Sequence, residues 1–399
     1  MASRASSLVN ELSTIIKSPT FECDSEMQTK AIALSRRLNM ALKQPPDAAL
    51  ELMFWPGFVF CFRVAIELGL FSLIVESDKP RTAVELSQTT GAEEQLIVRI
   101  MRAISGFGFV DETGDNVWRA NPQTHAMAQK PIQAAHIHIW DQCTTTMAKM
   151  LPFLAQTGWK CPTDAHAGAF QYAFDTDKEV FEYWHEIPAV MQNFNTFMTG
   201  NRGSRPAWTE WYPVRERVID GFDAQDGDGV LLVDVAGGRG HDVEHFLRKM
   251  RDEVGEEWKG RLVLEDLPKV IEDISELNGR IEKVKYDFFT PQPIKGARTY
   301  FFRFVFHDWS DELCLKILEN LVPAMKRGHS KVLFNEIIIP NRDSPMFYVG
   351  MDMSMMAMHT AKERSEKDWV ELLAKAGLKV NKIWPPPGYG EGIVEAELA

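Results

Sequence analysis

The residue best suited to acid–base chemistry in this chain is His307, which comes directly after an aromatic and β-branched run at 301–306. A helical pattern begins just beyond it, with Ser310 as its expected N-cap. Groups at the carboxyl ends of strands in an open α/β sheet face the ligand crevice. Because an imidazole titrates near neutral pH, His307 is a candidate general base. The alternative is a histidine that only closes a strand end.

A glycine-rich turn lies upstream of this histidine. Residues 236–240 read Ala-Gly-Gly-Arg-Gly and follow a largely apolar run at 230–235. Glycines at such a turn let the backbone approach a ligand closely. Val243 stands where the dinucleotide fingerprint would have its third glycine, and the turn lacks the Gly-Lys-Ser/Thr of a phosphate-binding loop. The pattern indicates a nucleotide-type strand–turn–helix, with a plain tight turn as the alternative.

Acidic residues follow the second and third strands that the sequence predicts. Asp266 comes just after an apolar run at 261–264, where a carboxylate can accept hydrogen bonds from ribose hydroxyls. Asp287 and Phe288 follow a third run at 284–286 and are candidates for holding an adenine ring. These acids, like His307, are therefore expected at one edge of the sheet.

The remaining strands complete the fold prediction. A fifth strand is expected at 331–338, with Glu336 near its end, and a helix at about 367–376 follows. Two further strands, 378–384 and 392–398, have no helix between them. The order predicts an α/β fold with seven strands, in a mostly parallel sheet that ends in an antiparallel hairpin.

Four motifs, at 233–240, 265–271, 306–312 and 362–369, occur in an order and spacing that identify a family resemblance. The chain resembles small-molecule O-methyltransferases dependent on S-adenosylmethionine, of the plant caffeic-acid type and its fungal relatives. The resemblance extends from about Pro46 to the C-terminus. It implies a Rossmann-like methyltransferase sheet, preceded by a helical winged-helix dimerisation domain.

The resemblance also implies a cofactor site for S-adenosylmethionine. Asp266 would bind the ribose hydroxyls, and Asp287 with Phe288 would hold the adenine. Arg303 falls where the family has a lysine near the methionine moiety. The full set of expected cofactor-binding residues is Gly237, Gly238, Asp266, Leu267, Asp287, Phe288 and Arg303.

By the same resemblance, His307 would deprotonate a phenolic or enolic hydroxyl, and Glu336 and Glu363 would flank and orient it. The acceptor would be a small aromatic or polyketide-type secondary metabolite, whose oxygen attacks the sulfonium methyl in line. Aromatic and methionine side chains suit a flat aromatic substrate. The expected substrate pocket consists of Met191, Phe194, Met198, Asp308, Met355 and His359, with plain core packing as the alternative for the first three.

Two other functions remain open at this point. A fold of this type can catalyse a non-methylating pericyclic or dehydrating step, in which the bound sulfonium acts as a fixed charge. Loss of the base or its partners would indicate such a change, whereas His307, Glu336 and Glu363 are all present. A scaffold dimer without catalysis is the third interpretation.

The N-terminal part has the plan of a winged helix. Helices are expected from Thr82 to Gly91 and at 94–105, and a β-wing is expected around Gly114. One interpretation is DNA binding, which the acidic charge of the chain opposes. In the family that the chain resembles, this module forms the dimer. We therefore expect a homodimer and three regions: 1–130 for dimerisation, 131–207 as helical connector and pocket, and 208–399 for cofactor binding and catalysis.

Composition favours an enzyme that binds small molecules. The formal net charge of −12 argues against a nucleic-acid partner. Five cysteines without C-x-x-C spacing and an N-terminus without an apolar signal core predict a cytoplasmic protein. The apolar stretch 53–75 is interrupted by Arg63 and Glu67, so no membrane partner is expected. His136 and His138 would not share a helix face, and we predict no metal site.

Overall fold

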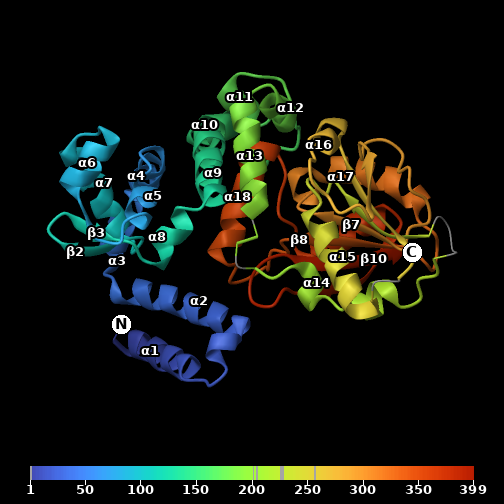
Figure 1. Ribbon diagram of the computed structural model, residues 1–399, viewed down its shortest axis with the longest axis horizontal. Coiled ribbons are helices and arrows are strands. Elements are labelled where there is room, and N and C mark those ends of the chain that lie inside the picture. Colours follow the sequence, from blue (N-terminus) through green and yellow to red (C-terminus); the bar gives the residue numbers. More distant parts are fainter. Residues whose placement is uncertain (1, 201, 204, 225–228, 256–257) are drawn as a thin grey trace. The chain divides into compact units, whose positions relative to one another are not determined.

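The computed structural model describes residues 2–399 apart from 201, 204, 225–228 and 256–257 (Figure 1). The chain forms two compact units. The N-terminal unit contains residues 1–18, 31–148 and 181–203, and the C-terminal unit contains 19–30, 149–180 and 204–399. The expected connector, 131–207, is thus divided between the two units.

The C-terminal unit is built on a seven-stranded sheet with the order β6-β5-β4-β7-β8-β10-β9. Only β10 runs antiparallel to its neighbours, β8 and β9, as predicted. The strand order reverses between β4 and β7, and such a switch point is where open α/β sheets bind ligands. The strands are β4 (Val230–Val235), β5 (Arg261–Asp266), β6 (Ile281–Lys285), β7 (Thr299–Arg303), β8 (Lys331–Glu336), β9 (Leu378–Trp384) and β10 (Gly392–Leu398).

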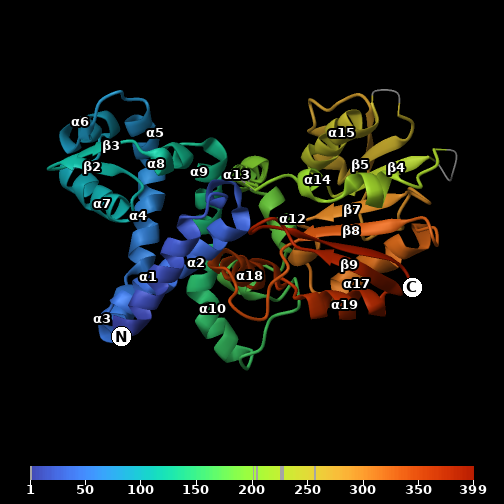
Figure 2. The same cartoon turned by 90° about the horizontal axis from the view of Figure 1, so that it is seen from below.

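Helices cover both faces of this sheet, which explains why its central strands read as continuous apolar runs. In Figure 2, α14 and α15 lie on one side of the strands and α17 and α19 on the other. Each face has its own buried cluster, one including α15 side chains such as Phe246 and the other including Trp369 of α19. These helices are α14 (Trp208–Trp211), α15 (His241–Val254), α16 (Pro268–Glu272), α17 (Asp311–Leu321) and α19 (Glu366–Lys375).

One strand ends earlier than the sequence predicts. The apolar run was expected to continue as a strand up to His307, but β7 ends at Arg303 and Phe304 has a positive φ of 51°. The carboxylate of Glu336 accepts hydrogen bonds from the amides of Val305 and Phe306, which takes them out of the ladder. His307 therefore lies in a short 3₁₀ turn, η4 (Phe306–Asp308), and not at the strand end itself.

The rest of the C-terminal unit is helical. Ser310 caps α17 as predicted, because its side chain accepts a hydrogen bond from the Leu313 amide. Helix α18 runs beside η4, and its last residue, His359, lies four residues before Glu363. The remaining elements are η1 (Phe21–Cys23), α10 (Thr145–Gln156, shared with the other unit), α11 (Ala169–Phe174), η3 (Arg215–Ile219), η5 (Val322–Ala324) and α18 (Met346–His359).

The N-terminal unit contains the two helices and the β-wing that the sequence predicts. A capping box between Thr82 and Glu85 starts α6, and Gly91 ends it in a left-handed conformation. The small sheet has the order β1-β3-β2. The elements are α1 (Ala2–Ile16), α2 (Ser25–Leu42, shared), α3 (Pro45–Leu52), α4 (Trp55–Glu67), α5 (Leu70–Val75), β1 (Arg81–Thr82), α6 (Ala83–Thr90), α7 (Glu94–Gly106), β2 (Asp111–Gly114), β3 (Val117–Arg119), α8 (Pro122–Met127), α9 (Lys130–His138), η2 (Ile139–Thr144), α12 (Val180–His185, shared) and α13 (Pro188–Gly200).

Helices α3 and α4 leave apolar side chains in solvent. Leu52, Met53 and Phe54 are 65%, 62% and 56% exposed, and Trp55 is 45% exposed. Within the described residues, no single helix is long and apolar enough to cross a membrane. Helices α3 and α4 taken together, with a 43° bend between them, have the length and composition of a membrane span.

Candidate active site

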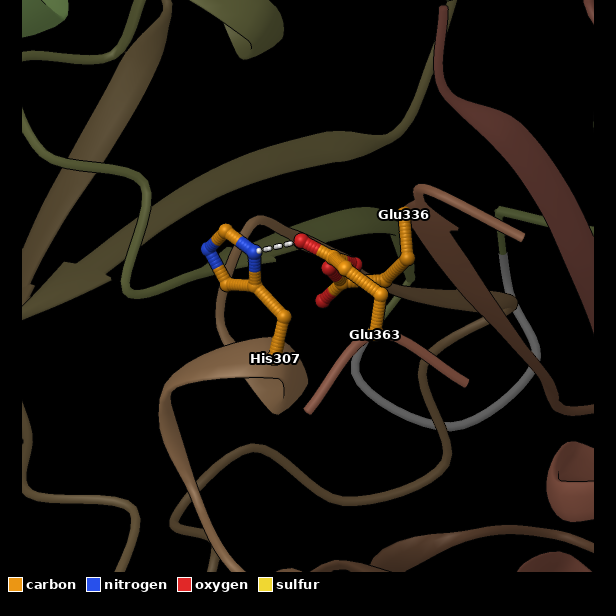
Figure 3. A group of neighbouring side chains, drawn as sticks. All are labelled: His307, Glu336 and Glu363. Atoms are coloured by element: carbon orange, nitrogen blue, oxygen red, sulfur yellow. Dashed lines mark hydrogen bonds and ion pairs between the residues drawn. The ribbon is translucent and has the colours of Figure 1, made fainter. Parts of the chain in front are cut away.

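The centre of the site is a hydrogen bond between a histidine and a glutamate (Figure 3). Nδ1 of His307 lies 2.9 Å from Oε1 of Glu363. Both side chains are buried, and Glu363 comes from the segment between α18 and α19. A carboxyl group at Nδ1 fixes the orientation of the ring and directs Nε2 away from the pair.

Glu336, at the end of β8, lies beside this pair but makes different contacts. Its Oε1 accepts the amides of Val305 and Phe306, each at 2.9 Å. It therefore supports the backbone that leads into His307. The sequence predicted that both glutamates orient the base. The structure brings all three side chains together, but only Glu363 contacts the imidazole ring. Glu336 holds the main chain that carries it.

The same three residues have the spacing of a metal site. One ligand atom from each of His307, Glu336 and Glu363 lies within 4.8 Å of the others, and no other such group occurs in the described part of the chain. Nδ1 of His307 and Oε1 of Glu336 already have hydrogen-bond partners. The contacts fit a hydrogen-bonded cluster, and the absence of a metal stays a prediction.

Burial controls the charges of the acids around His307. It raises the pKa of Glu336 to about 7, against an opposing effect of the nearby histidine, and it raises the pKa of Asp308 to about 7 in the same way. Burial also raises the pKa of Glu363 well above its ordinary value, and the charge of Asp352 adds to this. Near neutral pH the cluster thus holds protons that solvent-exposed carboxyls would have lost.

Of the expected substrate-pocket residues, Asp308 contacts the histidine directly, and His359 contacts Asp308. Oδ1 of Asp308 is 3.5 Å from Nε2 of His307 and 3.8 Å from Nε2 of His359. His359 and Met355 are buried on α18. The other three, Met191, Phe194 and Met198, lie on α13 of the N-terminal unit, and their part in the pocket stays a prediction.

The glycine-rich loop and Asp266 lie together, as the sequence predicts. Oδ2 of Asp266 accepts the Gly238 amide at 2.8 Å, and Oδ1 accepts the Leu267 amide at 2.7 Å. A Cβ on Gly237 would lie 2.5 Å from the Asp234 carboxylate, so this position requires glycine. A Cβ on Gly238 would meet no atom within 4 Å, so this part of the loop borders open space beside Asp266. An open loop next to a carboxylate fits the ribose of an adenosyl cofactor.

Two further expected cofactor residues lie on the segment after β6. Oδ1 of Asp287 accepts the Phe289 amide at 2.9 Å. Phe288 lies edge-on to Trp309, with ring centroids 5.9 Å apart, and Phe289 lies edge-on to Trp309 at 5.0 Å. Trp309 was missed as a site residue, although its position directly after His307 and Asp308 in the motif could have indicated it.

Arg303 is held more firmly than the sequence could indicate. Its guanidinium donates to Oε1 of Glu391 at 2.8 Å and lies 3.5 Å from Oδ2 of Asp242. It also lies over the ring of Phe304, 4.8 Å from the centroid. Phe304 in turn stacks on the His307 ring at 4.8 Å. Arg303 therefore links the end of β7 to α15 and β10.

Two protein-family models match this chain: an O-methyltransferase domain over residues 164–379 and an O-methyltransferase dimerisation domain over 50–130. Among curated proteins, O-methyltransferase penC of Penicillium thymicola is 38% identical over 94% of this chain and 92% of its own. O-methyltransferase asqD of Emericella nidulans is 39% identical over 86% of this chain and 87% of its own.

Solved structures agree with these relatives. A complex of LepI with SAM has a TM-score of 0.88 and 26% identity, covering 99% of this chain and 100% of that one. A structure described as a pericyclic reaction enzyme has a TM-score of 0.87 and 27% identity, covering 98% and 99%. OxaC in complex with SAH and oxaline has a TM-score of 0.85 and 28% identity, covering 99% of both chains.

Proposed function

Because the chain belongs to the O-methyltransferase family and S-adenosylmethionine is its cofactor, we propose that it methylates a hydroxyl of a small aromatic or polyketide-type metabolite with His307 as the general base. The observation that carries this proposal is the 2.9 Å contact between Nδ1 of His307 and Oε1 of Glu363, located beyond the carboxyl ends of β7 and β8. Fungal relatives that are named O-methyltransferases support the class of reaction.

The chemistry of the protein is proton removal and positioning. With one proton held between Nδ1 of His307 and Oε1 of Glu363, the Nε2 atom can accept the hydroxyl proton of the substrate. A positioned base of this kind contributes about 10²–10⁴-fold to the rate. S-adenosylmethionine, when bound, supplies the electrophilic methyl group. Asp266, Asp287, Phe288 and Arg303 would hold it, and Leu267 with the glycine-rich loop would line it.

The acceptor binds, in this proposal, where it can reach Nε2 of His307. Asp308 adjoins that nitrogen, and His359 lies against the other side of the Asp308 carboxyl, so both can offer polar contacts, while Met355 of the same helix as His359 can offer an apolar one. We also propose that Met191, Phe194 and Met198 of α13 contact the acceptor, because aromatic and methionine side chains suit a flat aromatic substrate. We also propose a homodimer that buries the exposed apolar side chains of α3 and α4, within the region that the dimerisation model matches.

The test is to replace His307 by alanine and follow methyl transfer from labelled cofactor to a panel of phenolic metabolites by mass spectrometry. Cofactor affinity should be unchanged, turnover should fall at least about 10²-fold, and the residual rate should rise with pH as the substrate ionises in solution. Near-full methylation of every accepted substrate by His307→Ala would contradict the assignment of the base.

One observation favours a second candidate function. The similarity to a pericyclic reaction enzyme extends over nearly the whole chain, so the same fold could hold the cofactor as a fixed charge. In that case the intact protein would convert a substrate without consuming S-adenosylmethionine. Measuring the cofactor and the substrate in the same reaction separates the two functions.

A further inference from the structure

The residue directly after Glu363 is a buried arginine with contacts on both sides of the catalytic turn. Arg364 is 1% exposed. Its Nη1 donates to the carbonyl of Phe306 at 2.5 Å, and its Nη2 donates to the carbonyl of Trp309 at 2.9 Å. These two carbonyls lie on either side of His307 and Asp308. One guanidinium therefore binds the main chain before and after the proposed base.

We propose that Arg364 is a positioning residue for His307, a role that rests on the proposed function of that histidine. Glu363 holds the imidazole through its side chain, and Arg364 holds the backbone that carries the imidazole. Two consecutive residues thus fix one side chain at two places. Arg364 does not touch the reacting atoms and acts only through His307.

The turn needs this support because the sheet does not hold it. β7 ends at Arg303, and Phe304 has a left-handed backbone. The Glu336 carboxylate accepts hydrogen bonds from the amides of Val305 and Phe306, at the start of the turn. Arg364 donates hydrogen bonds to the carbonyls at the two ends of the turn. Two side chains from other parts of the unit therefore provide the main partners of this short segment, and the Cys314 thiol is a weaker donor to the same two carbonyls, at 3.4 Å from each. Loss of Arg364 would leave these buried carbonyls with weak donors only, which is costly.

Arg364 is itself fixed from several directions. Its Nε and Nη2 donate to Oδ1 of Asp311 at 3.0 and 2.8 Å. Its carbonyl accepts the amide of Ile339, just beyond β8, and its guanidinium lies over the Trp369 ring at 5.6 Å. A planar fork with several donors can satisfy two carbonyls and a carboxylate at once, whereas a lysine ammonium cannot reproduce that geometry.

The test compares Arg364→Lys with a matched control, Arg298→Lys, in both the wild-type and the His307→Ala background. Arg298 also donates to three backbone carbonyls, those of Val218, Asp220 and His329, but it lies just before β7, at the amino end of the strand. Both substitutions remove a guanidinium from main-chain acceptors. Only Arg364→Lys should affect the position of the base.

We expect Arg364→Lys to lower kcat about 10- to 100-fold, the scale of a small misplacement of a reacting group, with KM for S-adenosylmethionine within about twofold of wild type. The deficit should shrink as pH rises and the substrate ionises by itself. In the His307→Ala background the same substitution should have little further effect, because the two residues act as a unit. An equal loss in both backgrounds, or a loss that Arg298→Lys reproduces, would overturn the proposal.

Hydrogen–deuterium exchange gives a readout that does not depend on catalysis. A peptide spanning 304–310 should exchange faster in Arg364→Lys than in Arg298→Lys, and equal exchange would overturn the proposal. If the wild-type protein transferred no methyl group, the proposed function would fail, while this measurement would still decide whether Arg364 holds the turn.

A second variant covers the case in which Arg364→Lys does not fold. Asp311 is half-exposed, so Asp311→Asn removes the charge that faces Arg364 while keeping an oxygen acceptor and opening no cavity. We expect kcat of Asp311→Asn to fall about 3- to 10-fold, the effect of weakening one charged hydrogen bond. In the His307→Ala background, Asp311→Asn should cause no further loss. Unchanged kcat in Asp311→Asn would then count against the proposal.

Discussion

Replacing Glu363 by glutamine tests the contact on which the proposed mechanism depends. The substitution keeps the size of the side chain but removes the carboxyl group that shares a proton with Nδ1 of His307 across 2.9 Å. It can also present an amide N–H to Nδ1, which would place the ring proton on Nε2, the nitrogen that must accept. Because both side chains are buried, water cannot replace the lost partner.

The expected size of the effect follows from that single contact. A hydrogen bond to a charged group contributes about 1.5–3 kcal/mol. If this is lost in the transition state, kcat should fall about 10- to 150-fold, at roughly 1.4 kcal/mol for each tenfold change in rate. Cofactor affinity should not change, since Glu363 makes no contact with the glycine-rich loop or Asp266.

Glu336→Gln is the matched control from the same cluster. The oxygen of Glu336 that accepts the Val305 and Phe306 amides has an equivalent in glutamine, so kcat should fall less than about 10-fold. Single-turnover kinetics with saturating cofactor would measure both variants. Equal losses in the two variants, or wild-type kcat in Glu363→Gln, would refute the division of roles between the two glutamates.

Three further predictions concern the cofactor, the oligomer and pH. Asp266→Asn should weaken binding of S-adenosylmethionine about 10- to 100-fold in calorimetry, because it disturbs both the ribose contact and the Gly238 amide, and unchanged affinity would remove Asp266 from the site. Light scattering should give about twice the 45.4 kDa chain mass, and Trp55→Asp should shift it toward the monomer whereas Val84→Asp, at a similarly exposed position, should not. Burial raises the pKa of Glu265 from 4.5 to about 7, so its contribution to stability is complete below pH 4.5 and is lost as pH rises through 7. In urea unfolding, the free energy of unfolding of Glu265→Gln should rise relative to that of wild type by about 3 kcal/mol as the pH increases from 4.5 to above 7. A difference between the two proteins that stays constant at all pH values would contradict this.

Those parts of the fold that are encoded locally could be predicted from the sequence. The last two strands, 378–384 and 392–398, have the predicted bounds because apolar alternation and flanking turn residues mark both ends. The carboxylate of Asp266 meets the Gly238 amide because Asp266 ends β5, Gly238 lies in the loop after β4, and neighbouring parallel strands bring their carboxyl ends to the same edge.

Contacts between distant segments could not be predicted in this way. Glu391 binds both Arg205 and Arg303, from which it is separated by 186 and 88 residues, and no local pattern relates these positions. The early end of β7 has the same origin, since the carboxylate that takes Val305 out of the ladder lies 31 residues further along the chain. Side-chain capping from another strand overrides the β propensity of an aromatic run.

The left-handed residues of the crevice bear on how this protein could be engineered for stability. Ala236 and Phe304 both have a positive φ, a conformation that costs a non-glycine residue roughly 1–2 kcal/mol. Ala236 offers only a methyl group, which packs against the buried cluster on one face of the sheet, so glycine would lose little contact there. The ring of Phe304 lies between Arg303 and the His307 imidazole. A search for stabilising substitutions can therefore include position 236 but should leave position 304 alone, because the strain there keeps an aromatic surface against His307.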